Sequence, residues 1–267
     1  MILKRRVALN GIWLDELDER IIVSGIEPAD GKENISATDA ATGYGQTVTG
    51  IRRSTLDMVV KFKLWQKPKA ADGLMERSHL LEMVNAWAAG GGILTVNYKP
   101  NRRLNVILAQ APGEESLWEF DKEFTITFRA YTTPFWEDEE ENSAEIGGIQ
   151  SEGSGGFEIG GSAETQCNVI MENMSGAQIK GLAVSAGGKK MKFPQTVLAD
   201  GEALIFDHKQ GRVRIRVRSS EGEYRNIMAE RDPSSADDLM LKPGVHEAEF
   251  SAQRACKVTV TWRNRYL

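Results

Sequence analysis

The sequence predicts a mainly β protein with two domains, a β-rich N-terminal domain that contains one α-helix and a C-terminal β-sandwich. Three observations support this prediction. Short apolar runs with period-two alternation recur along most of the 267 residues. A helical stripe of apolar residues occurs once, within residues 74–89. An acidic, glycine-rich stretch divides the chain, so we expect domains at residues 1–137 and 162–267 and a linker at residues 138–161.

The linker prediction rests on the distribution of charge. The chain has a formal net charge of −5, and residues 137–161 hold eight acidic and no basic side chains. Such a run repels itself and stays solvated. Ile146, Ile149, Phe157 and Ile159 are its isolated apolar residues, and we expect them to pair at most weakly with a neighbouring sheet.

Strands are expected throughout the N-terminal domain. Met58, Val60, Phe62 and Leu64 alternate with polar residues and should share a buried face. The expected strands are residues 7–14, 20–23, 58–65, 93–98, 103–109 and 120–131. Residues 24–50 are polar and rich in Gly, Ala, Asp and Thr, and they form an unusually long loop in this interpretation.

The expected helix covers residues 74–89. Its stripe places five apolar side chains on one side of the helix: Leu80, Leu81, Val84, Trp87 and Ala88. Asp72 is a candidate N-terminal cap, and Gly90, Gly91 and Gly92 should end the helix.

The C-terminal domain shows only strand patterns. Val258, Val260 and Trp262 should face inward in the last strand. Seven short strands in about 105 residues are typical of a sandwich, and they are residues 169–171, 181–184, 191–193, 203–206, 213–217, 227–229 and 256–262.

The residues that could carry catalysis do not form a recognisable set. His79, His208 and His246 are too scattered for a metal site, and we expect them on the surface. Ser154 lies in a Gly-Ser-Gly-Gly sequence, but a nucleophile needs a rigid setting and a nearby base, which the acidic linker does not provide. We therefore predict that the chain is not an enzyme and that it has no catalytic residue, metal or cofactor.

Other site types are equally weakly supported. Gly187, Gly188, Lys189 and Lys190 lack the pattern of a phosphate loop and should form a hairpin turn with solvated lysines. Residues 137–141 could offer oxygens to calcium, but they lack the alternating acids of a calcium loop, so a solvated charge run is favoured.

Composition also limits the cellular setting. Cys167 and Cys256 are far apart in sequence, and although both fall in the second domain, a cytosolic origin would keep them reduced. No apolar run is long enough to span a bilayer, and residues 1–10 lack the apolar core of a secretory signal. The absence of a basic excess argues against sequence-specific nucleic-acid binding. We therefore expect synthesis in a cytoplasm and no membrane partner.

Arginines follow one strand of the second domain at every other position. Between them Val213, Ile215 and Val217 should pack inward. A solvent-exposed face with acids nearby is one interpretation, and a docking face for an acidic partner surface is another. Nucleic-acid binding is a third, but no base-stacking aromatic residues are interleaved with the arginines. The arginines in question are Arg212, Arg214, Arg216 and Arg218.

Aromatic residues leave two interpretations open. Trp13, Trp65, Trp87 and Trp262 occupy positions that favour packing in the core. Together with Tyr98, Tyr131 and Phe135 they would otherwise suggest a platform for sugars, because sandwich domains often bind glycans.

The order of motifs resembles siphophage distal tail proteins over nearly the whole chain. Residues 50–53, 62–65, 94–98 and 124–136 are similar to the family's N-terminal domain, in which a strand ending in an aromatic-proline cluster closes the fold. Residues 239–246, Leu-Met-Leu-Lys-Pro-Gly-Val-His, are similar to a turn in the family's galectin-like C-terminal sandwich. Two features depart from the family: His246 stands where an asparagine is frequent, and no long receptor-binding insertion interrupts the sandwich.

The resemblance implies a homo-hexameric ring at the tail tip of a virion, made in the bacterial host cytoplasm. The ring would join the tail tube protein to the tail-associated hub protein and would hold receptor-binding or baseplate proteins outside, while DNA passes through its channel. The missing insertion favours a scaffold over direct host attachment. Two other functions are a glycan-binding tail module and a tail tube protein.

The long polar segment supplies the expected contacts between subunits, because a loop without a core of its own gains order on a neighbour. The residues expected at these contacts are Ser36, Thr38, Tyr44 and Thr47 in the segment, and Arg52 and Arg53 just after it. Partner docking is expected at the four arginines of residues 212–218.

Overall fold

A computed structural model describes residues 4–29, 33–39, 46–53, 55–66, 71–209 and 212–267. The chain divides into two compact units, Met1–Trp136 and Glu137–Leu267. It is mainly β, and the described residues include one α-helix, as the sequence predicted. Each unit is built on a main sheet of its own and has its own buried residues.

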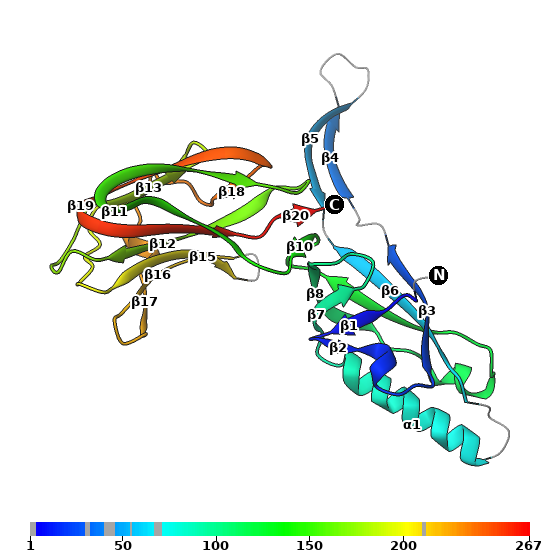
Figure 1. The fold of residues 1–267 in the computed structure, drawn as a ribbon. Helices are drawn as coiled ribbons and strands as arrows, with labels where there is room; N and C mark the ends of the chain where they lie inside the picture. The colour runs from blue at the N-terminus through cyan, green and yellow to red at the C-terminus, as the bar shows by residue number, and fades with distance from the viewer. Residues whose placement is uncertain (1–3, 30–32, 40–45, 54, 67–70, 210–211) are drawn as a thin grey trace. The chain divides into compact units, whose positions relative to one another are not determined.

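Unit 1 is built on an antiparallel sheet with α1 against one face (Figure 1). The sheet order is β2-β1-β7-β8-β9-β6-β3. Its elements are β1 (Val7–Leu9), β2 (Ile12–Trp13), a 3₁₀ turn (Leu14–Glu16), β3 (Ile21–Ala29), β6 (Leu56–Leu64), α1 (Ala71–Ala88), β7 (Gly92–Val96), β8 (Arg102–Gln110), a second 3₁₀ turn (Glu114–Trp118) and β9 (Phe124–Ala130).

The predicted alternation in unit 1 is confirmed. Met58, Val60, Phe62 and Leu64 of β6 are fully buried. The same pattern holds in β9, which pairs with β6 so that Val60 lies opposite Ile126. Because side chains in a strand alternate between faces, one inward row from each strand suffices to build a continuous core beneath the helix.

Helix α1 has the predicted stripe but begins earlier than predicted. Leu80, Leu81, Val84 and Ala88 are buried, and the Trp87 ring meets Phe128 edge-on at 5.8 Å between centroids. Asp72 lies inside the first turn, so it does not cap the helix from outside; its charge still favours the N-terminal end. Gly90, Gly91 and Gly92 all have positive φ and end the helix as predicted.

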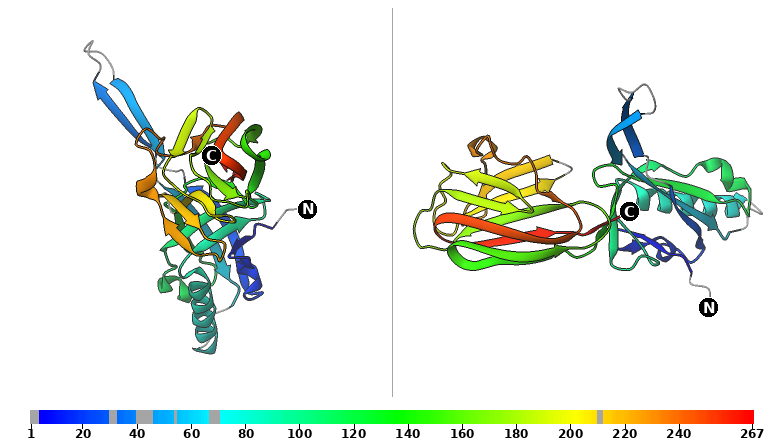
Figure 2. Two further views of the ribbon diagram at one scale, coloured as in Figure 1. Left: turned by 90° about the vertical axis from the view of Figure 1, so that its left-hand side faces the viewer. Right: turned by 90° about the horizontal axis from the view of Figure 1, so that it is seen from above.

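The long polar loop predicted at residues 24–50 is wrong. The chain continues through the rest of β3 and then forms a two-stranded sheet of β4 (Glu33–Asp39) and β5 (Gln46–Arg53), separate from the main sheet. Figures 1 and 2 show this hairpin extending away from the rest of unit 1. Apolar and polar residues alternate only weakly in this segment, so local patterns do not predict its strands. Pairing between the two strands stabilises the structure instead.

Unit 2 contains the strands that follow residue 136. Its sheet order is β14-β13-β19-β12-β15-β16-β17, with β11 pairing with β19 and β18 with β12. The elements are β10 (Trp136–Asp138), which contains the division between the units, β11 (Asn142–Ile159), β12 (Thr165–Asn173), β13 (Leu182–Ala186), β14 (Lys189–Phe193), β15 (Ala203–Lys209), β16 (Arg212–Arg218), β17 (Tyr224–Asn226), a 3₁₀ turn (Met228–Glu230), β18 (Met240–Leu241), β19 (Gly244–Trp262) and β20 (Arg265–Tyr266).

Two long strands, β11 and β19, create the layers of unit 2. The first part of β19 pairs with β13, as at Phe250 opposite Val184, and its last part pairs with β12, as at Val260 opposite Val169. Figure 1 shows both long strands bending back. Side chains from both halves belong to one hydrophobic cluster, so the sheet folds over its own core as a sandwich.

The predicted linker is wrong for residues 142–159, which form β11. Ile146, Phe157 and Ile159 are buried in the core, whereas Ile149 is exposed. The acidic residues are anchored as well, because Glu137 pairs with Arg265 at 3.2 Å and Asp138 donates its backbone N–H to the Asn264 carbonyl. Composition suggested a solvated chain because the partners of this segment lie 85 to 120 residues away in sequence.

The glycines of β11 have a structural role at its bend. The pairing with β19 shifts register between Ile146 and Glu152, and Gly147 and Gly148 have positive φ there. A Cβ on Gly153 would approach the Phe250 ring to 2.9 Å. Glycine therefore lets the strand turn and lets its backbone approach the neighbouring side chains.

The structure tests three further predictions about the strands and turns of unit 2. The strand expected at residues 227–229 is replaced by the 3₁₀ turn Met228–Glu230. The turn between β13 and β14 is a hairpin with positive φ at Gly187 and Gly188, as expected, although Lys189 pairs with Asp238 instead of remaining solvated. The inward packing of Ile215 and Val217 is confirmed.

The two cysteines are buried and do not meet. Cys167 lies opposite Trp262, whereas Cys256 lies opposite Asn173 at the other end of the same strand pair. Burial raises the pKa of the Cys167 thiol to about 12 and that of Cys256 to about 11. Both side chains therefore pack as small apolar groups.

Candidate binding surfaces

The β4–β5 hairpin holds most of the residues expected at subunit contacts. Ser36 and Thr38 lie on β4 with exposed side chains, and Thr47 lies opposite Thr38 on β5. Arg52 and Arg53 end β5 opposite Asn34 and Glu33. Tyr44 lies outside the described residues. An isolated two-stranded hairpin is marginally stable in water, so this one gains most from a partner surface.

The arginine strand β16 is partly neutralised within unit 2. Arg214 forms a two-pronged ion pair with Asp207 on β15, at 2.7 and 2.8 Å, and Arg216 contacts the same carboxylate at 2.6 Å. The Arg216 guanidinium also lies over the Tyr224 ring at 4.4 Å. A single carboxylate thus orders two arginines, as the interpretation with nearby acids expected.

The outer arginines differ from the central pair. The Arg212 side chain is exposed, and Arg218 lies at the other end of the strand, opposite Ala203. Asp207 balances only one of the four positive charges. The strand therefore keeps a net positive face, and the docking of an acidic partner stays a prediction.

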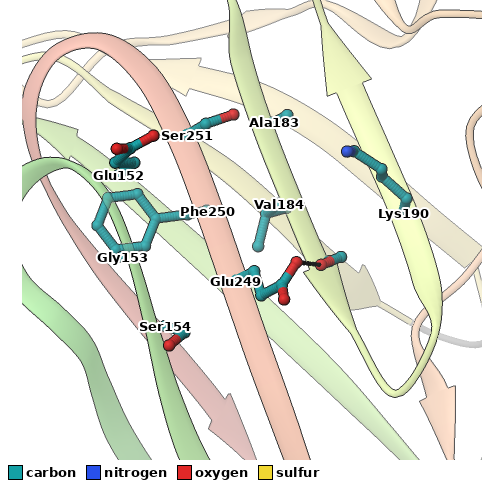
Figure 3. A pocket seen from close by; sticks show the side chains of 10 residues that line it. Glu152, Gly153, Ser154, Ala183, Val184, Lys190, Glu249, Phe250 and Ser251 are labelled. Atoms are coloured by element: carbon teal, nitrogen blue, oxygen red, sulfur yellow. Dashed lines mark hydrogen bonds between the residues drawn. The ribbon is translucent and has the colours of Figure 1, made fainter.

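A shallow polar groove lies on the outer face of the other half of unit 2 (Figure 3). Its volume is about 420 Å³. Register places four outward residues in one row across four strands: Ser154 (β11), Glu249 (β19), Ser185 (β13) and Lys190 (β14). The Ser185 hydroxyl donates to Glu249 at 3.5 Å, and Glu152 and Ser251 extend the lining.

The groove offers carboxylates, hydroxyls and an amine. Its aromatic residue, Phe250, points into the core with 4% of its surface exposed, so the groove lacks a ring for sugar stacking. Ser154, whose sequence suggested a nucleophile, lines this groove from a strand and not from a linker. The residues that line the groove include no histidine to act as its base.

The histidines do not gather. His79 is exposed on α1, and the Nε2 atom of His246 lies 2.7 Å from the Lys242 carbonyl. The prediction that His208 is a surface residue in a turn is wrong, because it lies on β15 with its ring edge-on to Phe206 and its two ring nitrogens buried. Burial lowers the pKa of His208, so the ring is neutral near pH 7. Among the described residues no three His, Cys, Asp or Glu side chains form a group that could hold a metal.

A buried arginine, which no sequence motif marks, organises one end of unit 1. Arg77 of α1 donates to the backbone carbonyls of Leu64 and Gln66 at the end of β6, at 2.9 and 2.8 Å. It also donates to those of Leu117 and Glu119, at 2.8 and 3.1 Å. Burial lowers its pKa, and the four carbonyls compensate for lost hydration. The usable signal was its position on the apolar stripe, seven residues before Val84.

Arg77 thereby fixes the backbone around two exposed tryptophans, Trp65 and Trp118. Trp65 and Trp118 each lie between two residues whose carbonyls Arg77 binds. They are 59% and 71% exposed, and the Trp65 ring packs on Phe120 at 5.3 Å. The prediction that Trp65 is a core residue is therefore wrong. Exposed tryptophans held in place are typical of protein-binding surfaces.

The remaining aromatic residues do not form one platform. Trp262 is buried as predicted, and Trp13 and Trp87 are half-buried. Tyr98 and Tyr131 are exposed at separate places in unit 1, and Tyr131 packs beside Arg129, which pairs with Asp57. No described helix has the length and hydrophobicity that a bilayer-spanning segment requires.

The two units together define a class of protein: a helix-containing β unit followed by a sandwich made from two long, bent strands. No family model matches the chain, and no curated protein matches its sequence. Solved structures do match it over its whole length.

One similar solved structure is that of the Dit protein of phage SPP1, described as a paradigm of the hub adsorption apparatus of phages that infect Gram-positive bacteria. The similarity covers 98% of this chain and 99% of that chain, with a TM-score of 0.68 and 14% sequence identity. A chain of the phage P2 baseplate in its activated conformation also matches, at 8% identity and a TM-score of 0.48, over 99% of this chain and 98% of that chain. The chain thus has the fold of a phage distal tail protein, as the sequence resemblance indicated.

Proposed function

We propose that the chain is a non-enzymatic structural subunit of a bacteriophage or prophage tail tip, where it forms a homo-hexameric ring between the tail tube and the hub. The observation that carries the proposal is the full-length match to SPP1 Dit, which includes both units and not a single common domain. SPP1 Dit is described as part of a hub adsorption apparatus, and we propose the same kind of assembly for this chain. A galectin-like topology for the sandwich stays a prediction from the sequence.

The β4–β5 hairpin supports a role in ring closure. It is separate from the main sheet, and Ser36 and Thr38 are exposed on it, so a neighbouring subunit can pack against it. In a cyclic ring the same hairpin would meet the same patch on the next subunit. Unit 2 would then hold baseplate or receptor-binding proteins outside the ring, with the arginine strand as one docking face.

The ring proposal is tested by imaging the purified chain alone and with its hub protein. We expect closed rings of about six copies in negative-stain images and a matching mass by native mass spectrometry. Deletion of residues 36–49 should abolish closure while circular dichroism shows both units folded. A chain that stays monomeric with and without the hub, or unchanged rings after the deletion, would contradict the proposal.

The arginine strand has its own test. Arg212→Glu reverses an exposed charge that has no role in the Asp207 contacts, so it should weaken docking of an acidic partner without loss of stability. Arg214→Glu would also disrupt the ion pair with Asp207 and serves as the contrasting variant. Equal docking by the wild type and Arg212→Glu would remove this face from the proposal.

Two alternative functions give different results in these experiments. A tail tube protein would polymerise into long tubes instead of single rings. A glycan-binding module would bind glycan arrays through exposed aromatic residues of unit 2, such as Tyr224. The absence of an exposed ring in the groove of Figure 3 makes the structural role the better supported one.

A further inference from the structure

The edge of unit 2 that β11 forms is unusually long. This strand of 18 residues pairs with β19 on one side, and no other strand in the described part of the chain pairs with it. The other two edge strands of the sheet, β14 and β17, have five and three residues. A long open edge presents unpaired N–H and C=O groups that can accept another strand, and natural proteins usually shorten, cover or interrupt it.

The interruption in β11 affects only its first half. Register shifts fall between Ile146 and Glu152, after which pairing with β19 runs without a break from Glu152 opposite Ser251 to Ile159 opposite Gly244. Eight residues of regular edge therefore remain open. Within this stretch, the described backbone hydrogen bonds lead only to β19.

The side chains on this edge do not obstruct an incoming strand. Glu152, Ser154, Gly156 and Glu158 are exposed on the same face. A Cβ on Gly156 would meet its nearest atom only at 3.9 Å, so the middle of the edge has free space above it. No proline occurs between Glu152 and Glu158, although proline is a common means of blocking an edge.

Charge indicates what kind of strand would fit. Glu152 and Glu158 lie at the two ends of the open edge, and the neighbouring positions of β19 on the same face add Glu247 and Glu249. In the described structure these four carboxylates form no ion pair with a lysine or arginine. A strand added at the usual spacing of about 4.8 Å would place long basic side chains within reach of Glu152, Glu158 and the groove beyond them.

We infer that residues 152–158 form a docking edge for an extended, basic segment of another protein, which adds to the sheet as its next strand. Main-chain hydrogen bonds to β11 would supply affinity, and lysine or arginine at alternate positions would select the partner through the glutamates. The same negative charge disfavours pairing with the β11 edge of a second copy. The inference concerns unit 2 alone and does not depend on ring formation.

The test uses two synthetic eight-residue peptides and hydrogen exchange of the full chain. One peptide alternates threonine with lysine, and the other alternates threonine with glutamate. We expect the lysine peptide to slow amide exchange in residues 152–158 and to bind at least about tenfold more tightly than the glutamate peptide. The double variant Glu152→Lys/Glu158→Lys should reverse this preference.

A matched control separates the edge from general electrostatics. Glu221→Lys/Glu223→Lys makes the same change of net charge on an exposed turn of unit 2 and should leave both affinities and the exchange pattern unchanged. Binding that fails to protect residues 152–158, that weakens equally in both double variants, or that is absent for both peptides would overturn the inference. Protection that grows with protein concentration, without peptide, would assign the edge to self-association instead.

Discussion

Two glycine-rich segments of this chain have different structural roles, because one ends a helix and the other lies within a strand. Residues 90–92 end the only helix among the described residues, and their positive φ angles are those expected where a chain leaves a helix. Residues 147–156 lie within a strand, where glycine allows the bend of β11 and close packing against Phe250. Glycine content alone does not distinguish a break in structure from a bend within it. The distinction depends on which other segments of the chain pack against the glycines.

The largest loss of stability should come from a substitution in the first segment, residues 90–92. Gly91 combines a positive φ with a backbone that lies against Val106, so Gly91→Val should destabilise unit 1 by about 4 kcal/mol through strain and overlap with the Val106 carbonyl. Denaturant unfolding followed by tryptophan fluorescence measures this, because most tryptophans lie in unit 1. Gly90→Ala, which has open space around it, is the control and should lose about 1 kcal/mol. Equal losses would show that conformation alone matters at both positions.

A second change leaves the glycines intact and removes the buried charge of the helix that they end. Arg77→Met keeps most of the side-chain volume but leaves four backbone carbonyls without this donor, and we expect a loss of about 3 kcal/mol. Since those carbonyls flank Trp65 and Trp118, quenching by acrylamide should also change. Arg20→Met, at a half-buried ion pair with Asp18, is the control. An unaltered unfolding curve for Arg77→Met would refute the anchoring role.

Substitutions in the second glycine segment, residues 147–156, should cause a smaller loss of stability. Gly153→Val places a branched side chain against Phe250 and Gln150, and the far end of Gln150 can move, so we expect a loss of about 2 kcal/mol from unit 2. Gly156→Ala faces open space on the same strand and should be nearly neutral. The two variants are compared by thermal unfolding of unit 2. If both were neutral, the glycines of residues 147–156 would have no role in packing, and the contrast with residues 90–92 would disappear.

The smallest effect concerns pH. The pKa of His208 is lowered by burial, so the unfolded state binds its proton more readily than the folded state. Its contribution to stability is therefore intact above about pH 6.5 and decreases as the pH falls below that value. His208→Leu should flatten this part of the stability profile, whereas the exposed His79→Gln should leave it unchanged. Identical slopes in the wild type and His208→Leu would exclude His208 as the source.

Local patterns predicted the parts of the fold that depend on nearest neighbours. Alternation in β6, β9 and the end of β19 showed which side chains are buried, because the geometry of a strand assigns successive residues to opposite faces. The helix and its glycine end followed from the spacing of apolar residues. The arginines of β16 were recognised in the same way, but Asp207, the partner of Arg214 and Arg216, became evident only from the pairing of β15 with β16.

The sequence by itself determined that the protein is mainly β, where its helix lies, which rows of residues face the core, and which family its order of motifs resembles. The tertiary structure decided that residues 33–39 pair with residues 46–53, that the acidic, glycine-rich segment is a core strand, that Arg77 is buried, and that the ring nitrogens of His208 are buried. The physical reason is the same in each case. A polar or glycine-rich segment has no strong local preference, so its structure is set by partners distant in sequence, such as β19 for β11, whose hydrogen bonds and apolar surfaces only folding brings together.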